Sequence, residues 1–219
     1  KGKAYTDNKN LEIYADNFEY LKDLDILKSN GNGLAILNSK NIEIEFDSAI
    51  FDQSKSTIEA FGNVLVKDMN KNIIIETDKV IYNQKKNLIT SDNKTILKDD
   101  FQNLYLVDSF EFEIDKDILK VTNLIFNDKE DNTVRTNLAY INTASGKLFG
   151  KDVNVDLNNS AFDEENEPRL KGNSINHDNN SSEITKGVFT TCKKNDNCPP
   201  WKISAEKIQH DKKNKIINY

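Results

Sequence analysis

The residues most able to do chemistry in this chain are two cysteines and two histidines. Cys192 and Cys198 lie in the stretch "FTTCKKNDNCPPWKISAEKIQHD", while His177 and His210 lie 33 positions apart. Two thiolates with two imidazoles form a common ligand set for zinc. However, the cysteines are spaced more widely than in a zinc finger and the histidines are far apart. We therefore predict no metal site and no cofactor.

The histidines have a simpler role as fillers. Each precedes an Asp close to a turn, in "NHDNN" and "QHDKK", at places where Tyr82 and Phe51 stand in earlier segments of the chain. The sequence also holds no glycine-rich phosphate loop, no HExxH and no nucleophile elbow. The acidic residues alternate on strand faces expected to meet water. These observations predict that the protein is not an enzyme.

Composition favours an all-β fold and disfavours nucleic acid as a partner. The 219 residues carry a net charge of -6 with both signs interspersed, and hydrophobic residues make up 37% of the chain. The sequence shows no basic face, and its apolar residues are mainly Ile, Leu, Phe and Val, which favour strands. No stretch approaches eighteen apolar residues. Because the chain starts without Met and without an apolar signal segment, we expect a mature or trimmed fragment.

Internal repetition supplies the elements that would position these residues. Segments that open with Asn and an apolar residue begin at Asn10, Asn41, Asn72 and Asn103, each 31 residues after the last. Looser copies begin at Asn132, Pro168 and Pro200, which gives seven rungs. The first half of each copy alternates apolar and polar residues, as a strand with one wet face does. A turn such as "DQSKS" or "NQKKN" then leads into a second strand.

Such units should stack, since a two-stranded ribbon cannot bury its apolar face alone. We therefore predict a single all-β domain over residues 1–219, a rolled antiparallel sheet of stacked strand-turn-strand rungs. The competing interpretation is an ordinary β-sandwich whose spacing happens to be regular. The acidic segment "NNSAFDEENEP", residues 158–168, is expected to be a surface loop between rungs five and six.

The residues expected to point inward are aliphatic or Phe and include no ionisable pair. They can simply pack against each other, or two walls of the sheet can stand apart and hold a hydrocarbon chain. Burial at about 0.8 kcal/mol per methylene would give about 10 kcal/mol for a chain of about a dozen carbons. The candidates for such a lipid groove are Ile42, Ile44, Phe46, Ile58, Val64, Val66, Ile73, Ile75, Leu104, Leu106, Phe110 and Phe112.

The repeat resembles the OstA-type organic-solvent-tolerance domains of lipopolysaccharide transport systems. "IIIETDKVIYN" (73–83) and "AFGNVLVKD" (60–68) carry the resemblance, and "NGNGLAIL" (30–37) matches more loosely. The resemblance implies a β-jellyroll or "β-taco", similar to LptA, whose interior takes the acyl chains of lipopolysaccharide. It also implies a periplasmic location and a periplasmic bridge protein of the same fold as a partner.

Residues 189–219 resemble the final rung and junction of the LptD family, where a periplasmic domain meets an outer-membrane barrel. The matching residues are Thr190, Thr191 and Cys192, then Trp201, Ala205, His210 and Asp211. By that resemblance the chain is the N-terminal periplasmic domain of an outer-membrane protein. It would receive lipopolysaccharide from the bridge and pass it to a barrel with a plug lipoprotein. Trp201 would cap the last rung or touch lipid near the barrel.

The resemblance leaves two pairings open for the cysteines. Cysteine pairs suit an oxidising compartment such as the periplasm, and a bridge from Cys192 to Cys198 would stiffen the connection to the last rung. In the family the cysteine at the place of Cys192 pairs instead with one in the barrel. Both alternatives stand at this point.

Open sheet edges are the expected places for partners. We predict unpaired edges at Leu11–Ala15 and at the last strands, residues 203–208 and 215–219. An exposed edge recruits a further strand. The N-terminal edge should therefore take the bridge protein, and the C-terminal edge should continue into the barrel. The alternatives are that the chain is itself the bridge or the inner-membrane-tethered member of the pathway, or a structural β-repeat protein with a dry core.

Overall fold

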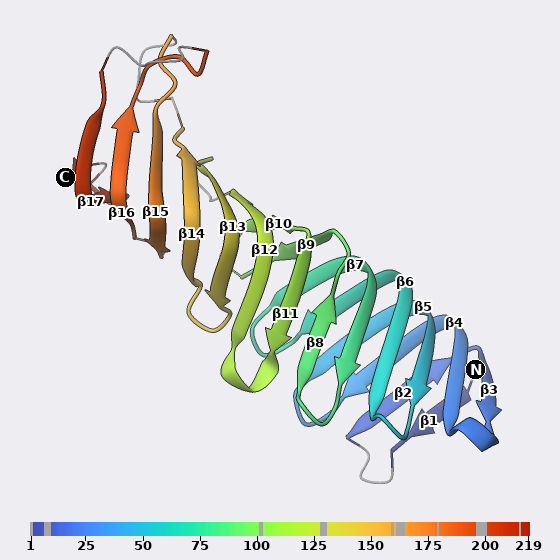
Figure 1. Cartoon of the computed structure of the whole chain (residues 1–219). Helices are drawn as coiled ribbons and strands as arrows, with labels where there is room; N and C mark the ends of the chain where they lie inside the picture. The colour runs from blue at the N-terminus through green and yellow to red at the C-terminus, as the bar shows by residue number, and fades with distance from the viewer. Residues whose placement is uncertain are drawn as a thin grey trace. The chain divides into compact units, whose positions relative to one another are not determined.

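A computed structural model describes residues 2–6, 10–100, 103–127, 131–158, 160, 165–178, 180–195, 201–214 and 216–219. Their strands pair antiparallel and are joined mostly by tight turns (Figure 1). Two short 3-10 helices, η1 (Lys22–Leu24) and η2 (Ile114–Lys116), occupy equivalent turns. The predicted all-β fold of antiparallel strand-turn-strand rungs is confirmed.

The chain forms two compact units. The first unit comprises Lys1–Asp100 and Val107–Leu119, and the second comprises Phe101–Leu106 and Lys120–Tyr219. The strands of the first unit are β1 (Gly2–Tyr5), β2 (Leu11–Ala15), β3 (Asn17–Leu21), β4 (Ile26–Leu37), β5 (Ile42–Asp52), β6 (Thr57–Asp68), β7 (Ile73–Asn83), β8 (Leu88–Ser91), β9 (Thr95–Lys98) and β11 (Ser109–Glu113). That residues 1–219 act as a single domain stays a prediction.

The second unit continues the same pattern of neighbouring strands. Most of β10 and β12 belongs to it, and β13 to β18 follow as successive antiparallel pairs. The bounds are β10 (Leu104–Val107), β12 (Ile118–Asn127), β13 (Thr133–Asn142), β14 (Lys147–Asp156), β15 (Arg169–His177), β16 (Ser181–Thr190), β17 (Ile203–Asp211) and β18 (Ile216–Asn218).

The asparagine that opens a repeat is the last residue of a tight turn. Asn41 and Asn72 adopt φ angles of 54° and 52°, in the left-handed region that Asn tolerates better than most residues. The carbonyl of Asn41 accepts the N–H of Met69 in the next turn of the same row, at 3.1 Å. Turns 31 residues apart are therefore linked directly, which gives the repeat a structural reason.

The long strands of the first unit bend near their middles. The pairing of β5 with β6 breaks between Glu45 and Ser48, opposite Gly62 and Asn63. Gly62 and Asn63 have φ angles of 75° and 44°, and the Asn63 amide donates to Asp47 Oδ2 at 2.8 Å. The rung before repeats this arrangement with Gly31, Asn32 and Asp16. The Gly-Asn pair and the Asp that faces it therefore encode the bend in the sequence.

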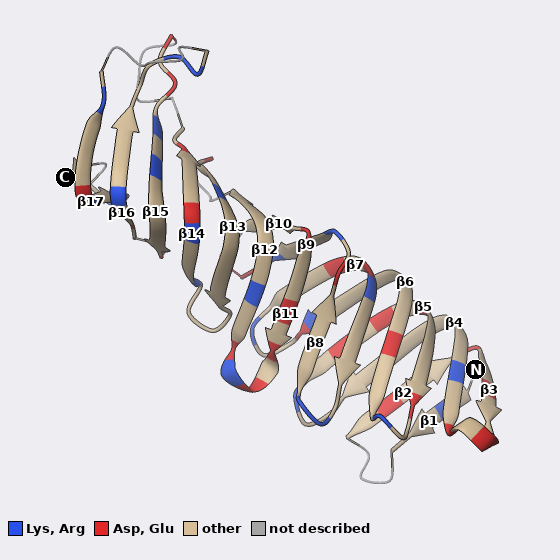
Figure 2. Cartoon of the chain, viewed as in Figure 1, with Lys and Arg blue, Asp and Glu red and all other residues tan. Residues whose placement is uncertain are grey.

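One wall of side chains lines the inner side of each bent strand. Alternate residues of β5, β6 and β7 are buried, while the residues between them are mostly half-buried or exposed. Figure 2 shows acidic and basic residues intermixed along these strands. The core therefore lies inside the fold of the sheet, and the charged residues lie mainly on its outer face.

We expect Gly62→Ala to destabilise the first unit by about 1–2 kcal/mol, the usual cost of a left-handed conformation for a residue with a side chain. The added Cβ would also lie 2.5 Å from Asp47 Oδ2. Denaturant unfolding measures the change. Glu59→Ala, on the same strand and half-buried, is the control and should change stability by less than about 1 kcal/mol, since it removes only a partly exposed ion pair with Lys79. Equal stability of Gly62→Ala and the unchanged protein would contradict this account of the bend.

Candidate functional site

The apolar interior is the first candidate for a functional site. Ten of the twelve predicted groove residues are buried, at 0 to 6% exposure: Ile42, Ile44, Phe46, Ile58, Val64, Val66, Ile73, Ile75, Phe110 and Phe112. Their inward placement on β5, β6, β7 and β11 agrees with the sequence pattern. Because the side chains shield one another from solvent, the interior of the first unit is closed in this structure.

The prediction that Leu104 and Leu106 point inward is wrong. Both are half-buried, whereas Tyr105 and Val107 of the same strand are buried at 3% exposure each. Tyr105 is paired with Phe126 of β12, and their rings stack with centroids 4.9 Å apart. Because of this stacking, Tyr105 and Val107 point inward, and the Leu residues of β10 lie on the opposite face.

A few polar side chains also face the interior, and they satisfy each other. Thr95 Oγ1 donates to Thr77 Oγ1 at 3.1 Å, and Thr77 Oγ1 lies 3.3 Å from Ser91 Oγ. In the second unit His177 is buried, with Nδ1 2.8 Å from Ser182 Oγ and its ring edge-on to Phe126. His177 is thus a core residue, as expected. Among the described residues, no buried side-chain nitrogen or oxygen lacks a partner.

Ion pairs join opposite ends of the strands in the first unit. The turn between β4 and β5 carries Lys40, whose Nζ lies 2.5 Å from Asp115 Oδ1 in the turn at η2. Lys71, in the turn between β6 and β7, lies 2.7 Å from Asp117 Oδ1. A straight strand of eleven residues would hold its ends about 35 Å apart. These contacts therefore require the sheet to fold over, and they close its interior along one side.

The two ion pairs differ in their surroundings. Hydrogen bonds from Lys40 and then Asn87 lower the pKa of Asp115, which is itself exposed. Burial acts to lower the pKa of Lys71, yet hydrogen bonds to Asp117 and Asp68 outweigh it and the pKa lies above its usual value. Lys71 also bonds Asp68, whose side chain is only 2% exposed, at 3.0 Å. Lys71 therefore neutralises a buried carboxylate as well as tying two turns together.

The C-terminal rung holds the residues of the predicted junction. Trp201 is 43% exposed, and its ring meets Phe189 edge-on at 5.9 Å between centroids. Its carbonyl accepts the Thr190 hydroxyl at 2.8 Å. Trp201 therefore packs against Phe189 while part of its ring stays in solvent, and its role at a junction stays a prediction. Cys192 is half-buried, but the predicted bridge to Cys198 lies outside the described residues and stays a prediction.

The sheet edges differ from the expectation at the N-terminus. Leu11–Ala15 is not an edge, because β1 pairs with it from Gly2 opposite Ala15 to Tyr5 opposite Glu12. Residues before the first repeat form strand β1, which the repeat pattern did not predict. At the other end β18 pairs only with Gln209, His210 and Asp211 of β17. Within the described residues, Ile203–Ile208 therefore pairs on one side only, as predicted.

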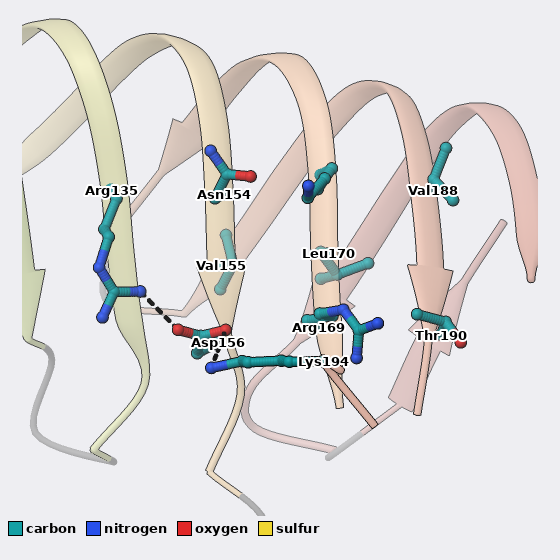
Figure 3. A pocket seen from close by; sticks show the side chains of 10 residues that line it. Arg135, Asn154, Val155, Asp156, Arg169, Leu170, Val188, Thr190 and Lys194 are labelled. Carbon is teal, nitrogen blue, oxygen red and sulfur yellow. Dashed lines mark hydrogen bonds and ion pairs between the residues drawn. The ribbon is translucent and has the colours of Figure 1, made fainter. Parts of the chain in front are cut away.

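A second candidate site lies on the outer face of the second unit, across β13 to β16 (Figure 3). It is a pocket of about 570 Å³. Neighbouring strands place Arg135, Asn154, Lys171 and Val188 in one row, and Asp156, Arg169 and Thr190 in the next. Lys194 reaches back from beyond β16 to lie 3.1 Å from Asp156. Four of its ten lining residues are basic and one is acidic.

Residues 11–167 match the family described as OstA-like protein. The chain belongs to the OstA-like family. One solved structure similar to this OstA-like chain is LptH of Pseudomonas aeruginosa, the LptA-homologous periplasmic component of a lipopolysaccharide transport device. It is 10% identical with a TM-score of 0.43, and the match covers 48% of this chain and 76% of LptH. No curated protein matches the chain.

Further structural findings bear on the chemistry of the OstA-like chain. The described residues contain no cluster of three or more His, Cys, Asp or Glu able to hold a metal ion. They also contain no helix with the length and apolarity needed to span a membrane.

Sequence reasoning missed both the ion pairs between turns and the outer pocket. Lys40 and Asp115 are 75 positions apart in chain segments of unremarkable composition. The pocket arises from cross-strand register, which the looser spacing of the later repeats did not reveal. One feature of the sequence could have indicated the pocket. Arg135 and Arg169, which both line it, are the two arginines of a lysine-rich chain.

We expect Lys71→Met to destabilise the protein by about 1–3 kcal/mol, since it leaves the buried Asp68 carboxylate without its cation. Lys55→Met is the matched control, because Lys55 forms the same i,i+3 pair with Asp52 at 2.8 Å but is 74% exposed. An exposed pair contributes about 0–1 kcal/mol. Thermal unfolding of both variants measures the difference, and equal losses would show that the burial of Asp68 has no influence.

Proposed function

We propose that the OstA-like chain transports lipopolysaccharide through the periplasm, with its interior holding the acyl chains. The observation that carries this proposal is the inward set of the first unit, which is aliphatic and aromatic over several successive rungs. Membership of the OstA-like family supports it. A lining that is mainly apolar suits a hydrocarbon guest.

The closed interior implies how a guest enters. The two walls bury one another, so an acyl chain has to replace contacts between side chains of the protein. Lys40–Asp115 and Lys71–Asp117 lie at the ends of the strands, where the walls would part. Partly exposed ion pairs contribute little free energy to keeping the two walls together. Burial of each methylene of an acyl chain contributes about 0.8 kcal/mol to binding. An acyl chain can therefore displace the closed state.

We propose further that the chain is the N-terminal periplasmic domain of an LptD-type outer-membrane protein. It would accept lipopolysaccharide from a bridge protein of the same fold and pass it to a barrel with its plug lipoprotein. The half-exposed Trp201 and the one-sided pairing of Ile203–Ile208 support a junction there. With β1 covering β2, the bridge protein would add its strand to β1. A role as the bridge itself is the alternative.

Photo-crosslinking at Ile75 tests the proposed transport role. Ile75 is 1% exposed, and its neighbour Ile74 faces the other way at 36% exposure. With a photoreactive amino acid at either position in cells that make lipopolysaccharide, we expect adducts at position 75 and few or none at 74. Immunoblotting for lipopolysaccharide reads the result. Absence of adducts at 75 and at Phe112 would support a dry structural repeat instead.

The reading frame of the gene beyond Tyr219 distinguishes an LptD-type domain from a bridge protein. We expect it to continue into several hundred residues of alternating strands if the chain is the LptD-type domain. A stop codon soon after Tyr219 would favour the bridge protein.

A further inference from the structure

The outer pocket of the second unit has an excess of positive charge. Arg135, Arg169, Lys171 and Lys194 line it together with a single carboxylate, Asp156. Asp156 pairs with Arg135 and with Lys194. Among the described residues, no carboxylate lies within ion-pair distance of Arg169 or Lys171. The chain as a whole is acidic, with a net charge of -6, so this concentration of cations is local to the pocket.

Backbone carbonyls fix the guanidinium of Arg169. One of its nitrogens donates to the carbonyls of Glu167, at 3.1 Å, and of Cys192, while the other lies 3.4 Å from the carbonyl of Lys193. Carbonyls orient the group without neutralising it. The side chain of Glu167 is directed elsewhere, because it accepts the backbone N–H of Lys194. Arg169 is therefore a positioned cation, which binds an anion with little loss of conformational entropy.

The remaining lining narrows the chemical class of ligand. The pocket of about 570 Å³ is far larger than one phosphate ion and lies in the range of small-molecule sites. Among the described residues that line it, none is an aromatic side chain on which a nucleotide base could stack. The amide of Asn154 lies between Arg135 and Lys171 in the row of cross-strand neighbours, where it can exchange hydrogen bonds with hydroxyl groups.

We propose that this pocket binds a phosphorylated saccharide. Arg169, Lys171 and Lys194 hold the phosphate, and Asn154 contacts the sugar hydroxyls. Lys194 runs along one end of the pocket, where its side chain extends across β14 to Asp156 (Figure 3). The site lies on the face opposite to the apolar core, so it does not depend on acyl-chain binding. Its ligand can be a free sugar phosphate or the headgroup of a glycolipid.

Calorimetric titration with glucosamine 1-phosphate tests the proposal. We expect binding that weakens as salt is raised, and weaker or no binding of glucosamine and of inorganic phosphate. Lys171→Ala and Lys194→Ala should each weaken binding about tenfold, the usual effect of losing a charge-assisted hydrogen bond. Lys151→Ala is the matched control, since Lys151 is exposed on β14 and outside the pocket. Circular dichroism checks that each variant is folded.

Several outcomes would overturn the proposal. These are no binding of glucosamine 1-phosphate, equal binding of inorganic phosphate, or equal weakening by the Lys151 variant. Phosphatidylcholine vesicles with and without lipopolysaccharide then identify the source. Lipopolysaccharide-dependent binding that Lys171→Ala abolishes assigns a glycolipid headgroup, and binding of the free sugar phosphate alone assigns a soluble ligand. Adducts at Ile75 are measured separately, so either proposal can fail without the other.

Discussion

The structure depends on the bend in the middle of its long strands. A sheet of strands ten to twelve residues long exposes two faces, and this chain has apolar residues for only one of them. Folding each strand at its midpoint lets the apolar face cover itself. The bend needs residues in the left-handed region, supplied by Gly62 and Asn63, and the hydrogen bond from the Asn63 side-chain amide to Asp47 holds it. The second unit has left-handed residues in the middle of its strands as well, at Asn123, Asp152 and Lys186.

Hydrogen bonds between turns and contacts in the core together explain why the repeat spacing is regular in the first rungs and looser in the later ones. In the first unit, the carbonyl of one turn accepts a backbone N–H from the next turn in its row, so the spacing between turns is fixed by hydrogen bonds. An inserted residue would break that contact and reverse the faces of the following strand. Where the chain leaves the strict spacing, particular contacts between side chains on neighbouring strands set the faces instead. Tyr105 on Phe126 is an example.

The sequence was sufficient to predict what depends on local periodicity. Alternation along β5, β6 and β7 identified the inward residues, and the spacing of Asn residues identified the rungs. It was insufficient where long-range contacts decide. The face of β10 follows from an aromatic partner more than twenty positions away, and β1 lies in a segment without alternation. The basic pocket depends on the register between β13, β14, β15 and β16, which no short motif encodes.

The pairing of Lys40 with Asp115 has a consequence for how the first unit forms. Hairpins such as β5–β6 connect residues close in sequence and can assemble early, whereas this ion pair spans 75 positions. Contacts of such high sequence separation form slowly, because a long loop loses entropy on closing. During synthesis, β4 to β7 emerge before Asp115 exists. The nascent sheet therefore has an uncovered apolar face during that interval.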